Sequence, residues 1–169
     1  VTASVLTKIY VMDADGSNLK RLTKSNQNEF KPIWSPDGRW IAYTTWSHAR
    51  GGHIYKMRSD GKGKRRQLTD IEAFYTDLAF SPDGSTIVAM RGNEFLRNQT
   101  FSEFGGLRIP LELISLPAKG GEQTVIKALD SGRYPHFGPE ADRVYLTGDD
   151  GLFSLTLSGT AVSYTHLRA

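Results

Sequence analysis

Two copies of one hairpin motif constrain the fold of this chain more than any other feature. The segments WSPDGRWIAY (34–43) and FSPDGSTIVA (80–89) each place an aromatic residue, Ser-Pro-Asp-Gly and a run of β-forming residues in the same order. Within such a turn, proline presets φ, aspartate caps the turn through its carboxylate, and glycine accepts a positive φ. We therefore predict two β-hairpins at equivalent positions of a repeated unit.

A second repeated segment sets the size of that unit. The segments IYVMDADGSNLKRLT (9–23) and IYKMRSDGKGKRRQLT (54–69) share an apolar-polar alternation, an Asp-Gly turn and a closing Leu-Thr. LELISLPAKGGEQTVI (111–126) follows the same design, and LFSLTLSG (152–159) begins it again. The turn glycines are 45, 59 and 39 residues apart: Gly16, Gly61, Gly120 and Gly159. Intervals of this size are typical of β-propeller blades.

Together the two segments describe a unit of four strands joined by hairpins. We therefore predict an all-β fold, a β-propeller fragment of about three four-stranded blades. Residues 31–69 form one whole blade in this prediction, and residues 76–127 form the next. Residues 5–23 supply part of an earlier blade, and residues 134–159 supply the first three strands of a later one. Because closed propellers have about four to eight blades, we expect a parent protein with six to eight.

The composition narrows the kinds of partner and site. The net charge of +3 is small for 169 residues, and the one basic cluster, KGKRR (62–66), does not by itself indicate nucleic-acid binding. The absence of cysteine excludes disulfides and Cys-based metal sites. No apolar run is long enough to predict a transmembrane helix. We expect neither a nucleic-acid partner nor a membrane span.

The two ends of the chain indicate that the propeller is partial. The sequence opens on Val1 without the pattern of a signal peptide, so we expect any signal to precede it. The final segment VSYTHLRA (162–169) resembles a translated sequencing adaptor, and we predict a non-native tail after a partial propeller of residues 1–161. The alternative is a genuine outer strand, because Val162 and Tyr164 alternate with polar residues.

At the segments quoted above, the chain resembles the TolB-like β-propeller family, whose blades repeat a pattern close to IYVMDADGSNLKRLT followed by PIWSPDGRWIAY. The resemblance extends over about residues 5–160. The segments TTWSHARGGHIYKM (44–57) and AFYTDLAFSPDG (73–84) are similar to blades of bacterial proteins in which a TolB-like propeller precedes a metal-dependent amidohydrolase domain. The resemblance supports the same fold as the repeat spacing.

The resemblance implies a non-catalytic segment of a larger bacterial protein that acts as a scaffold, a protein-interaction module or a substrate gate. The implied partner is another protein or a downstream catalytic domain of the same chain, in the periplasm or outside the cell. The alternatives are a periplasmic TolB-type interaction protein of the cell envelope and the gating propeller of a prolyl-oligopeptidase-like serine peptidase. We expect no catalytic residue and no cofactor in this segment, and the parent's activity stays open.

Several residues that could carry chemistry have simpler structural roles. The four histidines lack the spacing of a zinc site, so we expect no metal there: His48, His53, His136 and His166. DADGSN (13–18) begins like a calcium loop, but an EF-hand needs glycine where Asn18 stands, so we predict a hairpin turn. Ser35 and Ser81 begin the predicted hairpins and have no Gly-x-Ser-x-Gly context.

Two features remain as candidates for binding. Lys31, Asp77 and Tyr134 each stand three residues before the aromatic residue that ends the first strand of a blade. Since the first strand of each blade lines the propeller channel, we predict that these side chains lie near its mouth. Residues 93–108 interrupt the repeat as an insertion rich in aromatic residues, which either docks a neighbouring domain or folds back onto its own blade.

Overall fold

The computed structural model describes most of the chain, with side chains up to residue 160: residues 6–47, 51–92, 111–130, 133–149 and 151–165. Strands and turns make up these residues, which confirms the predicted all-β fold. None of them forms a helix that is long and apolar enough to cross a membrane. The predicted insertion, 93–108, lies outside the described residues.

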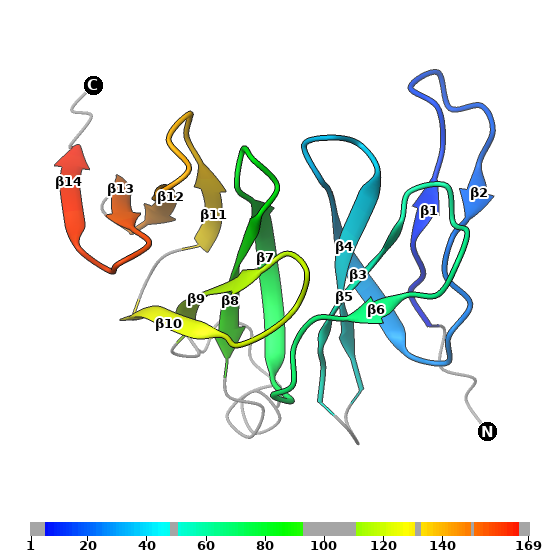
Figure 1. Ribbon diagram of the computed structural model, residues 1–169, viewed down its shortest axis with the longest axis horizontal. Helices are drawn as coiled ribbons and strands as arrows, with labels where there is room; N and C mark the ends of the chain where they lie inside the picture. Colours follow the sequence, from blue (N-terminus) through cyan, green and yellow to red (C-terminus); the bar gives the residue numbers. More distant parts are fainter. Residues whose placement is uncertain (1–5, 48–50, 93–110, 131–132, 150, 166–169) are drawn as a thin grey trace.

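The described strands form one two-stranded hairpin and three four-stranded antiparallel sheets. These units follow one another along the molecule in chain order (Figure 1). The hairpin contains β1 (Tyr10–Val11) and β2 (Lys20–Arg21). The next sheet contains β3 (Asn28–Trp34), β4 (Trp40–Trp46), β5 (Ile54–Arg58) and β6 (Arg66–Gln67). The third unit contains β7 (Phe74–Phe80), β8 (Thr86–Gly92), β9 (Leu111–Pro117) and β10 (Thr124–Leu129). The last contains β11 (Arg133–Phe137), β12 (Arg143–Gly148), β13 (Gly151–Thr156) and β14 (Ala161–Thr165).

In each sheet the strands pair in chain order, which is the meander of a propeller blade. The prediction of a propeller fragment with about three four-stranded blades is confirmed. The structure differs from the prediction in the last blade, where β14 adds a fourth strand by pairing with β13. A strand here is what we expect if the segment is native. The non-native origin of residues 162–169 stays a prediction.

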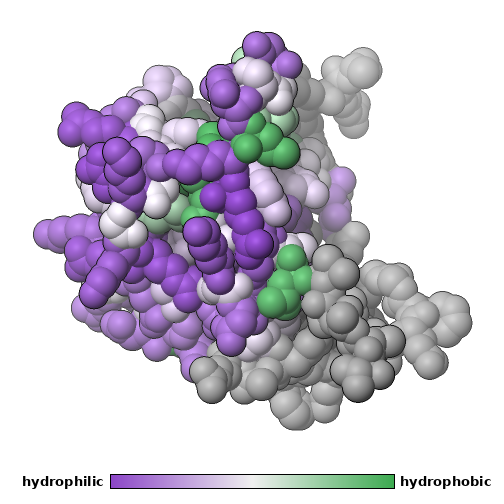
Figure 2. All heavy atoms as spheres, turned by 90° about the vertical axis from the view of Figure 1, so that its right-hand side faces the viewer, coloured by the Kyte–Doolittle hydropathy of each residue, from purple (hydrophilic) through white to green (hydrophobic). Residues whose placement is uncertain are grey.

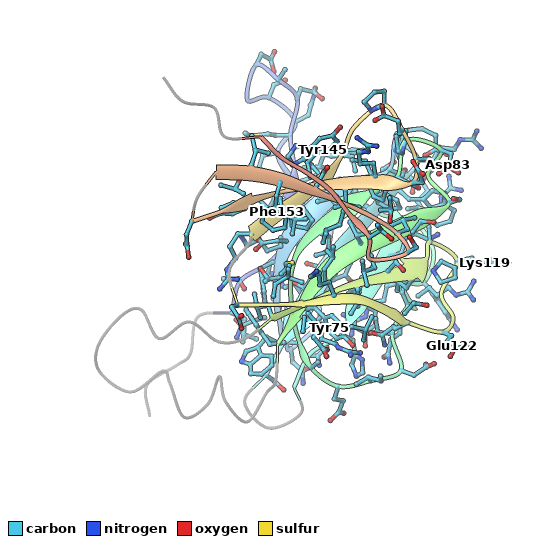
Figure 3. The ribbon with its side chains drawn as sticks, turned by 90° about the vertical axis from the view of Figure 1, so that its left-hand side faces the viewer. Tyr75, Asp83, Lys119, Glu122, Tyr145 and Phe153 are labelled. Atoms are coloured by element: carbon cyan, nitrogen blue, oxygen red, sulfur yellow. The ribbon has the colours of Figure 1, made fainter. Side chains whose placement is uncertain are left out.

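The Ser-Pro-Asp-Gly motifs form the hairpins between the first and second strands of two blades, as predicted. Ser81 Oγ donates to Asp83 Oδ1 at 2.5 Å and accepts from the Thr86 backbone N–H at 3.0 Å. Asp83 Oδ1 also accepts from the Ser85 N–H at 3.0 Å, and Gly84 has a φ of 70°. Figure 3 shows Asp83 at the same end of the molecule as Lys119 and Glu122, which lie in the turn between β9 and β10. The motif therefore acts as a turn with its own hydrogen-bond network.

Apolar side chains between successive sheets form the core. Three buried clusters fill the boundaries, one on each side of the β3–β6 sheet and one between the β7–β10 and β11–β14 sheets. Ile54, Ile87 and Ile114 are fully buried at the middle boundary. Each such side chain stabilises the fold by roughly 1.5–3 kcal/mol. Burial at the blade boundaries therefore holds the blades together and fixes the positions of the first strands.

Met57 and Met12 stand at equivalent positions of two blades and have different surroundings. Met57 is buried in the cluster formed with the β1–β2 hairpin. Met12 is 60% exposed, because no described blade precedes that hairpin. The β1–β2 hairpin thus covers the sheet that follows it, while no other described sheet covers its opposite face.

The hydrogen bonds of the second hairpin lower the pKa of Asp83 to about 2, with the Ser81 hydroxyl as the largest cause. Because the folded-state pKa lies below the ordinary value, the stabilisation is present above pH 3.8 and is lost as the pH falls toward about 2. We predict that Ser81→Ala returns the pKa of Asp83 toward 3.8, as followed by carboxyl ¹³C NMR titration. An unchanged titration midpoint in this variant would contradict the assignment to Ser81.

Candidate functional site

The candidate site begins with an unusual backbone feature that recurs in three blades. Lys31, Asp77 and Tyr134 have φ angles of 53°, 48° and 57°, in the left-handed region. Each lies where the first strand of its blade shifts register against the second, within β3, β7 and β11. A left-handed conformation costs a non-glycine residue about 1–2 kcal/mol. Strain of this kind clusters at functional sites, so its recurrence marks these positions as candidates.

The structure brings the three side chains together. Strand β7 lies between β3 and β11, so the first strands of adjacent blades are neighbours. Lys31 Nζ is 3.1 Å from Asp77 Oδ1 and 6.0 Å from the centre of the Tyr134 ring. The Asp77 side chain is 7% exposed, whereas that of Lys31 is half exposed. The cluster therefore joins three blades through one ammonium group that is still accessible.

Two hollows flank this cluster, and both are lined by all three residues. The larger, of about 340 Å³, is mostly apolar: Lys31, Pro32, Ile33, Asp77, Leu78, Tyr134, Pro135 and His136. The smaller, of about 270 Å³, lies on the other side of the cluster: Lys31, Phe74, Thr76, Asp77, Leu111, Arg133 and Tyr134. Tyr134 is 63% exposed, so a large aromatic surface is available beside them. The cluster thus combines apolar walls with an exposed aromatic ring and an accessible ammonium group.

The same geometry offers little for catalysis. Asp77 accepts the hydroxyl of its neighbour Thr76 at 3.2 Å and the Lys31 ammonium, so its carboxylate serves structure. His136 lies near Tyr134, with Nδ1 3.2 Å from the Tyr134 carbonyl and its ring stacked on Tyr145 at 5.7 Å. The Thr76 hydroxyl and the Asp77 carboxylate both line the smaller hollow, but Asp77 is paired with Lys31, and no histidine is among the described residues that line this hollow. The described residues of the two hollows therefore form a candidate binding site.

The other sequence candidates have local roles. His53 Nδ1 is 3.2 Å from Thr69 Oγ1, a contact within one blade. His48 and His166 lie outside the described residues. The DADGSN segment is a turn, closed by the Gly16 N–H donating to the Asp13 carbonyl at 2.9 Å. Among the residues that the structure describes, no three His, Asp or Glu side chains are grouped as metal ligands are.

Some residues that line these hollows, or are buried close to them in the chain, could not be singled out from the sequence. Thr76, Arg133 and His136 line the two hollows beside Lys31, Asp77 and Tyr134, but their residue types carry no pattern that sets them apart. The sequence also gives no sign that Glu29, an acidic residue near the start of β3, is almost fully buried. Only its position between Lys8 and Arg65 in space explains this burial.

The chain is similar in sequence to a known domain family and to several known proteins. Residues 1–104 match the TolB beta propeller domain. The chain is similar to the Tol-Pal system protein TolB of Thioalkalivibrio sulfidiphilus, with 40% identity over 58 residues, which are 34% of this chain and 13% of that protein. It is also similar to the uncharacterized peptidase YuxL of Bacillus subtilis, with 29% identity over 85 residues, 50% of this chain and 13% of the relative. The matched region is thus a small part of each relative.

The solved structures show the same fold. The structure of TolB from Acinetobacter baumannii superposes with a TM-score of 0.67 over 91% of this chain and 36% of that one, at 19% identity. At this identity the likeness concerns the fold alone. The domain match covers more than half of the sequence, and the four-stranded meanders agree with it. The chain therefore belongs to the TolB beta-propeller family.

Proposed function

We propose that this propeller segment is a non-catalytic binding module, which serves as a scaffold, a protein-interaction surface or a substrate gate in a larger bacterial protein. One observation carries the proposal: three successive blades hold a non-glycine residue in the same left-handed conformation, and the three side chains converge. A strained backbone that recurs in this way is retained where side-chain placement matters. Lys31, Asp77 and Tyr134 are the proposed recognition residues at the channel mouth.

The chemistry of the cluster defines the kind of partner. Asp77 already neutralises Lys31, and the larger hollow beside them is lined by proline, leucine and isoleucine side chains. The exposed Tyr134 ring offers an apolar face and a phenolic hydroxyl, a combination that is enriched in protein interfaces. We therefore propose a protein segment as the occupant, either from a separate partner or from a catalytic domain of the same chain.

Three parent proteins fit this role. The proposed parent carries a metal-dependent amidohydrolase domain after the propeller, in the periplasm or outside the cell, on the strength of the sequence resemblance. The similarity to TolB favours an envelope interaction protein as a second candidate. The similarity to a peptidase favours a gating propeller before a serine peptidase domain as a third.

Reading the codons that follow residue 161 in the parent gene, from an independent library, tests the domain context. A His-x-His motif at the end of an early barrel strand supports the amidohydrolase parent. A Gly-x-Ser-x-Gly elbow would instead support the serine peptidase parent. A stop codon soon after the last blade would support the TolB-type protein. Photo-cross-linking from position 134 tests the binding role.

A further inference from the structure

A second surface, on the outer side of the first two units, is strongly basic. Residues 20–24 and 58–66 contain eight basic side chains and one acidic one, Asp60, a net charge of +7. The remaining sequence has 13 basic and 17 acidic residues, a net charge of −4. The chain total of +3 therefore hides a marked separation of charge. Figure 2 shows the side of the molecule that carries the β1–β2 hairpin, where hydrophilic residues predominate.

The two segments form one continuous surface. Lys20 Nζ donates to the Asp60 carbonyl at 2.8 Å, which joins β2 to the turn between β5 and β6. The eight basic residues are all exposed: Lys20, Arg21, Lys24, Arg58, Lys62, Lys64, Arg65 and Arg66. Only Arg58 and Arg65 make ion pairs with other described residues, with Asp60 and Glu29 respectively. Most of the positive charge is thus available to a partner.

A cleft of about 410 Å³ opens in this surface, between the β1–β2 hairpin and the β5–β6 turn. Both walls come from described residues: Leu22, Thr23, Lys24, Ser25, Glu29, Tyr43, Met57, Gly61, Gly63 and Arg65. Lys24 and Arg65 bring positive charge to its sides. The one carboxylate, Glu29, forms ion pairs with Arg65 at 3.0 Å and Lys8 at 3.6 Å, while its Oε2 accepts no hydrogen bond from a described residue. The cleft therefore keeps a positive balance.

Tyr43 supplies an unused donor in the cleft. The residue is fully buried; the Arg65 guanidinium beside its Oη can only donate, and the phenolic O–H has no acceptor among the described residues. Burial raises the pKa of the Tyr43 phenol, against the opposing effect of the Arg65 guanidinium. The phenol consequently stays protonated and able to donate at neutral pH. A buried polar group without a partner is costly, so an acceptor from outside the described residues, a ligand atom or a water, is expected here.

Charged residues on outer strands also have a general use, because they prevent edge-to-edge pairing of sheets. The next blade shows that this use does not require such a density of charge. Its outer strand β10 carries one basic residue, Lys127, and the turn before it carries Lys119 together with Glu122. The basic surface is therefore specific to the first two units.

We propose that this cleft and its basic surroundings bind an acidic segment of a partner protein, with an aspartate or glutamate side chain accepting from Tyr43 inside the cleft. A carboxylate on an extended segment can enter the recess, and neighbouring acidic residues can pair with Lys24, Lys62 and Lys64 outside it. Phosphates of a bilayer or a duplex are presented on a broad face and do not reach a buried phenol. This surface is separate from Lys31, Asp77 and Tyr134.

Fluorescence polarisation of the full chain with a labelled octaglutamate peptide tests the proposal, with octaglutamine as the uncharged probe. We expect octaglutamate alone to bind, and more weakly as salt is raised. Lys62→Gln with Lys64→Gln should weaken binding about fivefold, as expected for two exposed charges. Lys119→Gln with Lys127→Gln, the matched pair in the next blade, should leave binding unchanged.

Tyr43→Phe removes the hydroxyl and keeps the packing, so binding of octaglutamate should weaken by about 2–10-fold with the fold intact by circular dichroism. The proposal is overturned by equal losses in the two lysine pairs, by no effect of Tyr43→Phe, or by equal binding of octaglutamine. Tighter binding to phosphatidylglycerol vesicles or to an oligonucleotide than to octaglutamate would also overturn it, in favour of those partners.

Discussion

Gly52→Ala should destabilise the fold by more than about 3 kcal/mol, the largest effect that we expect from any single methyl group here. A Cβ at this position would overlap the carbonyl oxygen of Thr45 and lie 3.0 Å from that of Ala73. Both atoms belong to the backbone, so neither can move aside without a shift of its strand. Gly52 forms a bridge with Ala73 at the start of the next blade, and the substitution therefore separates two blades.

Urea denaturation followed by tryptophan fluorescence measures this effect, because Trp46 lies at the same boundary with its ring 5.6 Å from that of Phe74. Gly38→Ala is the control. Gly38 has a φ of 69° and no atom near the position of a new Cβ, so that variant should lose only the conformational cost of about 1–2 kcal/mol. A loss for Gly52→Ala no greater than for Gly38→Ala would show that the blades do not approach as closely as described.

Glu29→Gln should cost about 3–5 kcal/mol, although the two side chains have nearly the same shape. Glu29 is 1% exposed and pairs with Lys8, whose side chain is only 6% exposed, and with Arg65. Without the carboxylate, the Lys8 ammonium keeps its bonds to the Ser25 and Gln27 carbonyls but loses the opposite charge. A buried charge without a counter-charge is the main source of the loss.

Two comparison variants separate the buried charge from a general effect of acidic residues. Asp60→Asn removes the carboxylate of an exposed pair with Arg58 and should therefore lower the stability much less than Glu29→Gln does. Lys8→Met added to Glu29→Gln should recover part of the stability, since the stranded ammonium is then gone. Equal losses for Glu29→Gln and Asp60→Asn, measured by urea denaturation, would contradict a buried ion pair at this blade boundary.

The fold was predictable because its signals are local and repeated. Ser-Pro-Asp-Gly determines a turn through its own residues, and Ser81, Asp83 and Gly84 make in the structure the contacts that their types indicate. The repeat then places each hairpin in a blade without any long-range information. The last blade shows the limit of this approach. Its fourth strand, β14, follows a turn at Gly159 but lies in the segment interpreted as a tail.

The sites were less predictable because they depend on distances between blades. The repeat placed Lys31, Asp77 and Tyr134 at equivalent positions, but nothing in their types indicates a left-handed backbone, which glycine or asparagine would adopt more easily. The ion pair between Lys31 and Asp77 spans 46 residues of sequence. The basic cleft depends on long-range contacts in the same way. Its walls come from residues 22–25 and from Gly61, Gly63 and Arg65, and only the fold brings these two segments together.

Photo-cross-linking from the channel mouth tests the central claim most directly. A benzoylphenylalanine at position 134 of the proposed parent protein, expressed in a bacterial host, replaces an exposed tyrosine at the proposed recognition site. The same probe at position 125, on the exposed outer strand β10, is the control. We predict one discrete protein adduct, to a partner or to a downstream domain of the same chain, from position 134 and none from position 125. Equal labelling from both positions, or none from position 134, would contradict a binding role for the channel mouth.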